Sequence, residues 1–224
     1  MTFDFTKIHL RHGSGKGDPQ DGLCLMQMVD WFNGHDKKLS DHPSCACPIL
    51  TRFGMCLNDS APSQAARDTL WPLVFQLISS RDPSMEKTRL EFLILEITKG
   101  PVAQAFEIIG EPDHATALRS VKTLGDVKKA ARKAKPAAYA NAAAVAAYGN
   151  AAAAAATAAA YAAYAAAAGN AANAAAYGNA KLKCWTEARN IFERAIALGK
   201  HGECDPVGQA PRLEQIKRIL VPAA

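Results

Sequence analysis

The residues best suited to nucleophilic chemistry are Cys24, Asp41 and His42. Asp21 stands where an N-cap is expected for the apolar run 23–32, which would place Cys24 in the first helical turn. There the helix dipole lowers the pKa of a thiol and favours the thiolate. With His42 as the base and Asp41 orienting it, the three side chains would form a Cys-His-Asp arrangement for acyl transfer.

A structural interpretation of the same helix is also open. Cys24, Met28, Trp31 and Phe32 would share one apolar face, where the thiol would act as a small core residue. Spacing alone does not show that a thiol and an imidazole meet. The sequence therefore allows both the catalytic and the structural interpretation, and favours the structural one.

The turn SDHPSCACP and the segment after it hold a second set of chemistry-bearing residues. His42, Cys45, Cys47 and Cys56 could offer four nitrogen and sulfur ligands to zinc. The CxxC pair typical of zinc sites is missing, so we expect no metal. No other motif indicates a cofactor.

Positive charge is concentrated in residues 122–135, which carry six basic residues and one acidic residue. The net charge of the whole chain is +5, so the remaining residues sum to zero. Such a local cluster is more often a solvated helix face than a nucleic-acid surface. If nucleic acid does bind here, the residues expected to contact it are Lys128, Lys129, Arg132, Lys133 and Lys135.

From Pro136 to Ala180 the chain contains 29 alanines in 45 residues and no charge. Alanine is the best helix former. One unbroken helix would be roughly 68 Å long, far larger than a domain with a radius of gyration of about 17 Å. We therefore expect close-packed antiparallel helices, separated at Gly149-Asn150, Gly169-Asn170 and Gly178-Asn179.

All the tyrosines of the chain lie in this tract, where their hydroxyls could line a rim that contacts a partner. They are Tyr139, Tyr148, Tyr161, Tyr164 and Tyr177. Asparagines and glycines interrupt any apolar span of membrane length, so no membrane helix is expected.

The remaining segments predict an all-α helical bundle, with at most a short extended segment over residues 3–10. We expect two regions, packed as one unit: 1–125, with the cysteine and histidine motifs, and 126–224, with the alanine tract and C-terminal helices. The expected helices begin at Pro48, Ser63, Trp71 (with a break at Pro72), Ser84 (ending at Gly100), Pro101, Pro112, Leu124, Lys181 and Pro211.

The N-terminal residues are mixed and polar, without the charged and apolar succession of a secretory signal. This predicts a cytoplasmic location, in which the cysteines would be reduced.

The motifs DGLCLM at 21–26, SDHPSCACP at 40–48, LND at 57–59 and DHATALR at 113–119, followed by the alanine tract, resemble a group of bacterial and prophage proteins. The matching residues are Gly22, Cys24, Met26, Asp41, His42, Pro43, Cys45 and Pro48. This resemblance implies no activity. The tract also resembles that of alanine-rich immunity proteins, which implies binding and neutralisation of a partner.

The leading hypothesis is a non-enzymatic helical protein that binds a protein partner, in the manner of an immunity protein or inhibitor. One alternative is a cysteine-dependent hydrolase or transferase using Cys24 and His42. The second alternative is a nucleic-acid-binding protein acting through residues 122–135.

Overall fold

The computed structural model describes the backbone of residues 9–108, 110–140 and 174–199, together with 211, 212, 214, 215 and 218. Within these ranges the side chains of 135–140 and 174–180 are not described. Most of the expected extended segment over 3–10 lies outside the described residues. So does most of the alanine tract, including Gly149-Asn150 and Gly169-Asn170.

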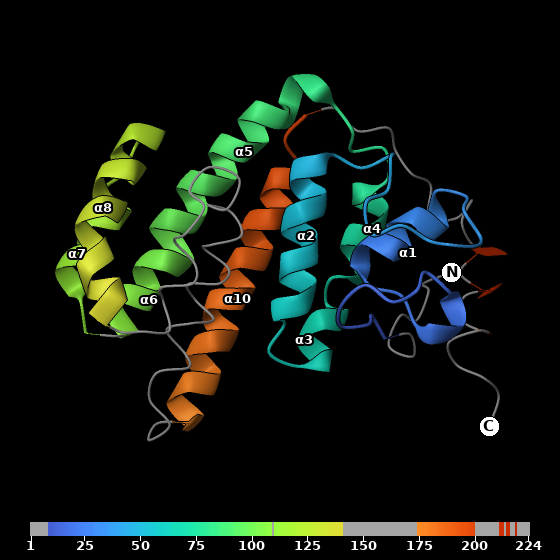
Figure 1. Cartoon of the computed structure of the whole chain (residues 1–224), viewed down its shortest axis with the longest axis horizontal. Coiled ribbons are helices and arrows are strands. Elements are labelled where there is room, and N and C mark those ends of the chain that lie inside the picture. Colours follow the sequence, from blue (N-terminus) through green and yellow to red (C-terminus); the bar gives the residue numbers. More distant parts are fainter. Residues whose placement is uncertain are drawn as a thin grey trace. The chain divides into compact units, whose positions relative to one another are not determined.

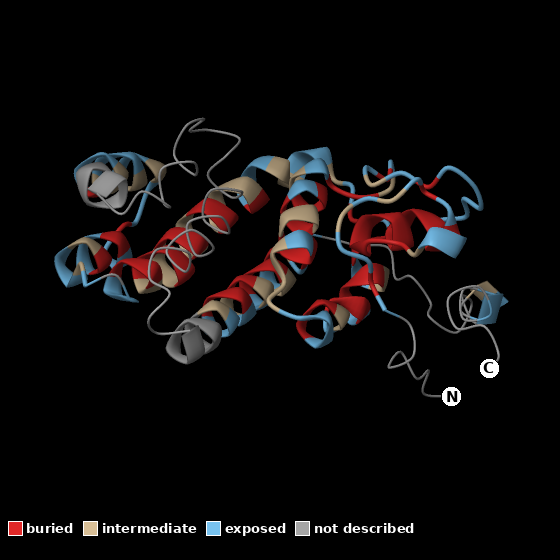
Figure 2. Cartoon of the chain, turned by 60° about the horizontal axis from the view of Figure 1, so that its bottom comes forward, coloured by how far each residue is buried: buried red, intermediate tan, exposed pale blue. Residues whose placement is uncertain are grey.

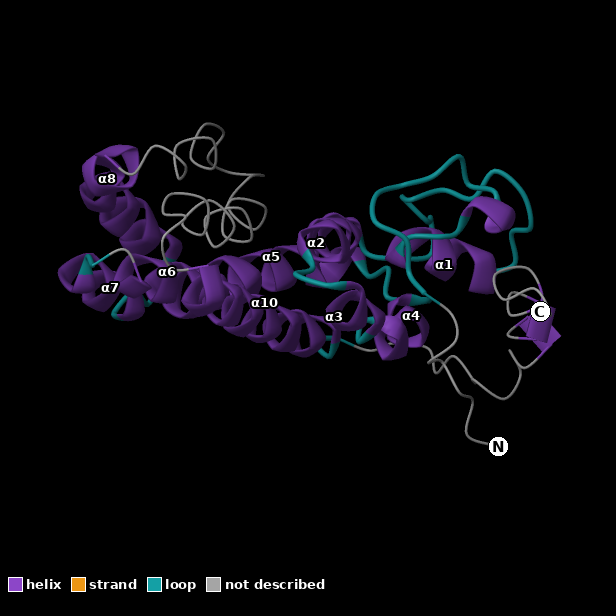
Figure 3. Ribbon diagram, turned by 90° about the horizontal axis from the view of Figure 1, so that it is seen from below, coloured by secondary structure: helices purple, strands orange, loops and turns teal. Residues whose placement is uncertain are grey.

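The described residues are all-α, which confirms the predicted fold class; they contain helices and loops but no strand (Figures 1 and 3). The chain divides into two compact units. Unit 1 consists of residues 1–86 and 196–224, and unit 2 of residues 87–195. The expected division at 125/126 instead falls inside unit 2.

Unit 1 contains the turn η2 (Pro19–Asp21) and the helices α1 (Leu25–Phe32), α2 (Pro48–Ser60), α3 (Gln64–Asp68) and α4 (Trp71–Leu77). All eight residues of α1 are buried (Figure 2). Helix α1 packs against both α2 and α4, with the Phe32 ring set edge-on to Trp71 at 6.4 Å between centroids. This central position explains why the segment is so apolar.

The start of α1 differs from the prediction, because its N-cap is Cys24 and not Asp21. Asp21 ends η2, whose own cap is the Asp18 carboxylate, which accepts the backbone N–H of Gln20 at 2.9 Å. Gly22 then adopts a φ of 81°, a conformation that interrupts helical geometry. The Cys24 sulfur therefore sits at the cap itself instead of in the first turn.

A buried asparagine ties the loop before α1 to the helices. Asn58 on α2 is fully buried. Its side-chain amide donates to the Arg11 carbonyl at 2.8 Å, and its side-chain oxygen accepts from the Leu25 N–H at 3.3 Å. Asp68 on α3 accepts the Leu10 N–H at 2.9 Å. Polar side chains thus satisfy loop backbone groups that would otherwise be buried without partners.

The helix starts predicted at Pro48 and Trp71 are confirmed, and the interruption expected at Pro72 lies just before α4, between α3 and α4. Pro48 occupies the first turn of α2 and Pro72 the first turn of α4, where a missing N–H costs no helical hydrogen bond. Ser63 caps α3 by accepting the Ala66 N–H at 3.1 Å.

The C-terminal segment of unit 1 is fixed to α1 through Arg212. The described positions between 211 and 218 are helical, as expected for this segment. Arg212 donates to the Trp31 carbonyl at 2.6 Å, pairs with Asp36 at 3.1 Å and lies over the Trp31 ring at 5.3 Å from its centroid.

Unit 2 contains most of α5 (Pro83–Ile97), then η3 (Thr98–Val102), α6 (Ala103–Ile108), α7 (Pro112–Arg119), α8 (Leu124–Ala140) and most of α10 (Ala174–Ile196). Helix α6 packs against α7, and α7 also contacts η3 and α8. Pro112 opens α7, as predicted.

Two expected features of α5 are wrong. The carboxylate of Asp82, and not Ser84, caps the helix start by accepting the Ser84 N–H at 3.0 Å. Gly100 does not end the helical path either, because the chain passes through it in the π-helical turn η3 and continues into α6. Pro101 has no N–H for an α-helical bond, and the wider turn instead lets the Ala103 N–H reach the carbonyls of Thr98 and Gly100.

Helix α10 runs antiparallel to the path α5–η3–α6, and the two lie side by side in Figures 1 and 3. Along α10, Cys184 bonds Gln104 at 3.1 Å, Glu187 lies against Gly100, and Arg194 pairs with Glu96 at 2.9 Å. Its buried face consists of Cys184, Trp185, Ala188, Ile191, Phe192 and Ala195.

Gly178-Asn179 lies within α10, so the predicted break there is wrong. A glycine in a helix interior costs only about 1 kcal/mol. The flanking alanines and the packing of the 184–195 face offset that cost. None of the helices in the described ranges combines the length and the apolar character required to cross a bilayer.

Candidate functional site

The Cys24 thiol does not have the lowered pKa that the sequence predicts. The side chain is only 3% exposed, and burial raises its pKa to about 11. Hydrogen bonds from the backbone N–H groups of Gln27 and Met26 lower the pKa, but burial outweighs them. The helix terminus lowers the pKa of the thiol, as expected, but desolvation raises it by more.

Asp41 and His42 form the expected pair without the thiol. The Asp41 carboxylate lies 2.8 Å from Nδ1 of His42, whose ring is largely exposed. Partial burial raises the pKa of Asp41, but hydrogen bonds from His42 and Ser14 prevail and hold it below its usual value. Among the described residues no hydrogen bond joins His42 to Cys24, so the structure supplies a base and an orienting acid without a prepared nucleophile.

The candidate zinc ligands are not assembled. No three of His42, Cys45, Cys47 and Cys56, all within the described ranges, come together in a cluster that could hold a metal ion. Cys47 is buried as the N-cap of α2, and its N–H donates to the Ser80 hydroxyl at 3.0 Å. Its role at the helix start is structural.

The basic segment forms a well-defined face on α8. Lys128, Lys129, Arg132 and Lys133 are exposed, whereas Ala134 is buried. At about 100° per residue, the four cations fall on one side of the helix and Ala134 on the other. In the described part of the chain none of the four forms an ion pair. We call this set the α8 basic face; the side chain of Lys135 lies outside the described residues.

The start of α8 is closed by a reciprocal cap. The Thr123 hydroxyl accepts the Asp126 N–H at 3.1 Å, and the Asp126 carboxylate accepts the N–H groups of Thr123 and Lys122 at 2.9 and 3.1 Å. These bonds, first that from Lys122, lower the pKa of Asp126. The only acid of the segment is therefore hydrogen-bonded at the cap; Lys129 acts on it electrostatically, but among the described side chains no ion pair joins it to the α8 basic face.

The side chains of the tyrosines predicted to form a partner-binding rim lie outside the described part of the chain. The side chains of Tyr139 on α8 and Tyr177 on α10 are not among those described, and Tyr148, Tyr161 and Tyr164 lie outside the described residues.

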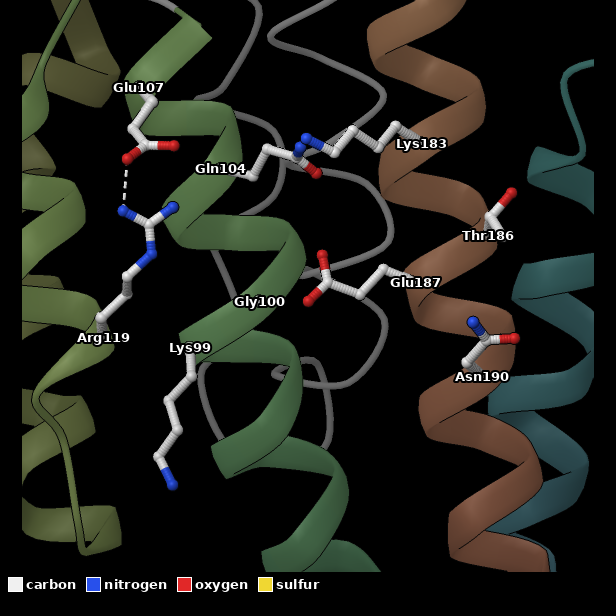
Figure 4. A pocket seen from close by; sticks show the side chains of 9 residues that line it. All are labelled: Lys99, Gly100, Gln104, Glu107, Arg119, Lys183, Thr186, Glu187 and Asn190. Atoms are coloured by element: carbon white, nitrogen blue, oxygen red, sulfur yellow. Dashed lines mark hydrogen bonds and ion pairs between the residues drawn. The ribbon is translucent and has the colours of Figure 1, made fainter.

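Unit 2 holds a polar pocket of about 560 Å³ between η3, α6, α7 and α10 (Figure 4). Nearly all of its lining side chains are charged or hydrogen-bonding. They belong to Lys99, Gly100, Gln104, Glu107, Arg119, Lys183, Thr186, Glu187 and Asn190.

Charges of both signs face this pocket. Glu107 and Arg119 form a short ion pair, which lowers the pKa of the Glu107 carboxyl. Lys183 acts on Glu107 in the same direction. The Glu187 carboxylate points from α10 towards Gly100, while Lys183 reaches towards Gln104 (Figure 4).

The sequence offered only indirect signals for this pocket. Lys183 and Glu187 stand four residues apart, which puts them on one helix face. Gly100, interpreted as a helix stop, instead lines the pocket wall. Residues from η3, α6, α7 and α10 converge here, and no local pattern shows which of them meet.

Comparisons of the chain with protein-family models, curated protein sequences and solved structures gave no match. The resemblance to bacterial and prophage proteins and to immunity proteins therefore stays a prediction, and the candidate sites are interpreted from their own geometry.

Proposed function

We propose that this chain is a non-enzymatic helical binding protein, similar in role to an immunity protein or inhibitor, which contacts an acidic protein partner through the α8 basic face. The observation that carries the proposal is the set of four exposed cations without an ion-pair partner in the described part of the chain. They lie on the side of α8 opposite its buried residue.

The spacing of these cations supports a role in binding. Lys128 and Arg132, like Lys129 and Lys133, are i,i+4 neighbours, and like charges at that spacing destabilise a helix by about 0.2–0.5 kcal/mol per pair. Carboxylates on a partner would relieve this repulsion and would steer the encounter over a distance set by the salt concentration.

Nucleic acid is the second candidate, and the concentration of the whole net charge in this segment favours it. The number of cations favours a protein. Four contacts are fewer than the roughly six to ten phosphate contacts of strongly salt-dependent DNA-binding proteins. The cysteine-dependent alternative is less favoured, because the Cys24 thiol is buried and its pKa is raised.

The proposal is tested by measuring fluorescence anisotropy of a labelled poly-glutamate peptide and of a labelled DNA duplex of equal charge. The test variant carries Lys128→Gln, Lys129→Gln, Arg132→Gln and Lys133→Gln. A control variant carries the same change of charge at exposed positions of unit 1, namely Lys16→Gln, Lys37→Gln, Lys38→Gln and Arg52→Gln. We expect the test variant to bind the peptide at least about tenfold more weakly than the control variant.

Equal peptide binding by the two variants would overturn the assignment to the α8 basic face. Tighter binding of duplex than of peptide, lost only in the test variant, would establish the nucleic-acid alternative instead. Absence of binding to either probe at low salt would remove both candidates.

A further inference from the structure

We propose that the polar pocket of unit 2 binds a free α-amino acid with a polar side chain. This inference does not rest on the function proposed for α8. It follows from the charges that the pocket presents and from the way the backbone holds one of them.

Lys183 and Glu187 provide opposite charges one helical turn apart on α10. Pairs of this kind commonly form an ion pair across the turn. Here they do not, and in the described ranges neither side chain has another ion-pair partner. Both line the pocket, with the Glu187 carboxylate pointing towards Gly100 and Lys183 extending towards Gln104 (Figure 4). Glu187 interacts electrostatically with Arg119 and Lys183 with Glu107, while Lys99, which also lines the pocket, pairs with Glu96 at 3.4 Å. The pocket thus offers a ligand one carboxylate and one ammonium that are not held in an ion pair.

The position of Glu187 depends on the glycine opposite. A Cβ built on Gly100 would lie 2.3 Å from Oε1 of Glu187 and 2.8 Å from its Cδ, far inside contact distance. Only glycine therefore allows the carboxylate to lie against η3. Turns of π type are frequent at functional sites, and this one places its glycine at the pocket wall.

The other lining groups are already committed or are suited to hydrogen bonding. Glu107 and Arg119 neutralise each other in their ion pair. The Gln104 side-chain oxygen accepts from the Cys184 thiol at 3.1 Å, which leaves the amide NH₂ to donate to a ligand. Thr186 and Asn190 are exposed at the α10 side of the pocket and can bond a polar ligand side chain.

These groups together define the ligand chemistry. A ligand ammonium would pair with Glu187, its carboxylate with Lys183 and the Gln104 amide, and its polar side chain with Thr186 and Asn190. A volume of about 560 Å³ lies within the usual range of small-molecule sites and accommodates such a ligand.

The test is isothermal titration calorimetry of the full chain with L-glutamine, N-acetyl-L-glutamine and L-glutaminamide. The second probe lacks the ammonium and the third lacks the carboxylate. We expect wild type to bind L-glutamine at least about tenfold more tightly than either derivative, because each derivative leaves one pocket charge unpaired.

Two variants test which charged group of the ligand each pocket side chain binds. In Glu187→Gln the preference for L-glutamine over the N-acetyl derivative should disappear, and in Lys183→Gln the preference over the amide should disappear. If Glu187 and Lys183 had only a structural role, neither substitution would remove one preference selectively. Lys87→Gln on α5 is the matched control for charge in the same unit, because Lys87 is exposed and does not line the pocket, and it should bind like wild type.

Gly100→Ala tests whether ligand binding in the pocket can be weakened without a loss of protein stability. The nearest atoms that its Cβ would meet belong to the flexible end of the Glu187 side chain, which can move aside. We therefore expect weaker L-glutamine binding without a fall in melting temperature. No heat with L-glutamine, equal affinity for all three probes, or unchanged selectivity in Glu187→Gln would each overturn the proposal.

Discussion

At Cys24 two opposing effects act on the same sulfur atom. The backbone N–H groups at the start of α1 stabilise a thiolate, and burial destabilises it. Burial prevails because almost no solvent reaches the side chain. A helix N-terminus prepares a nucleophile only where the sulfur also keeps contact with water or a cation.

The first prediction concerns the reactivity of this thiol. At neutral pH, iodoacetamide should label Cys24 at least about 100-fold more slowly than free cysteine, since a pKa near 11 leaves very little thiolate. The measurement is the rate of mass increase of the peptide containing Cys24, with urea-unfolded protein as the control. Labelling faster than free cysteine would revive the catalytic hypothesis.

The same pKa predicts a loss of stability in alkali. The thiol ionises near pH 9.0 when unfolded and near pH 11 when folded, so the folded state holds the proton more strongly. Its effect on the free energy of unfolding is constant below about pH 9 and falls by about 2–3 kcal/mol as the pH rises to 11. Urea unfolding of wild type and Cys24→Ala across this window should show a shallower decline in the variant; parallel declines would contradict the assignment.

Asn58 provides a prediction about a buried polar group. Asn58→Ala removes the partners of the Arg11 carbonyl and the Leu25 N–H, and should lower the free energy of unfolding by about 3 kcal/mol. Urea unfolding followed by circular dichroism measures this. Asn33→Ala, at an exposed position, should change the value by less than about 0.5 kcal/mol. Similar effects in both variants would show that the loop does not depend on Asn58.

Among the elements, the cap of α8 makes the most direct prediction. Thr123→Ala removes the hydroxyl that accepts the Asp126 N–H, and should destabilise the helix by about 1 kcal/mol. Thr123→Ser keeps the hydroxyl and should restore most of the loss. Hydrogen exchange of the first α8 amides measures the effect locally. Because the pKa of Asp126 is lowered, the carboxylate stabilises the cap above about pH 4 and this contribution disappears on acidification.

The sequence predicted those elements whose boundaries are decided locally. Pro48, Pro72 and Pro112 mark helix starts because the missing N–H affects only their own turn. Gly100 and Gly178 were predicted to end helices and do not. At Gly100 the deciding contact comes from Glu187, distant in sequence, which no local propensity contains.

The candidate sites also differ in whether local sequence predicts them. The α8 basic face follows from charge spacing, since one helix supplies all of its cations. The pocket requires residues of three helices to meet, namely Gln104 and Glu107 of α6, Arg119 of α7 and Glu187 of α10, and the sequence identified none of them as site residues. The burial that raises the Cys24 pKa could be inferred from the sequence only through the structural interpretation, in which Cys24 lies on an apolar helix face.

At the scale of the whole molecule, the charge distribution predicts how the protein behaves on an ion exchanger. The net charge of +5 resides in residues 122–135. The test variant at Lys128, Lys129, Arg132 and Lys133 and the unit 1 control variant have the same net charge. If a concentrated patch dominates retention, the test variant should elute from a cation exchanger at lower salt than the control. Coelution would show that net charge alone governs the interaction.

The antiparallel pairing of α5–η3–α6 with α10 closes a long loop within unit 2. Contacts such as Gly100 with Glu187 join residues separated by the entire alanine tract. The entropy of closing a loop grows only with the logarithm of its length, by about 0.6 kcal/mol for each doubling. Gain or loss of several alanines would change this term by only about 0.1 kcal/mol. On that term alone, the tract is free to vary in length during evolution while the helices that form the pocket stay paired.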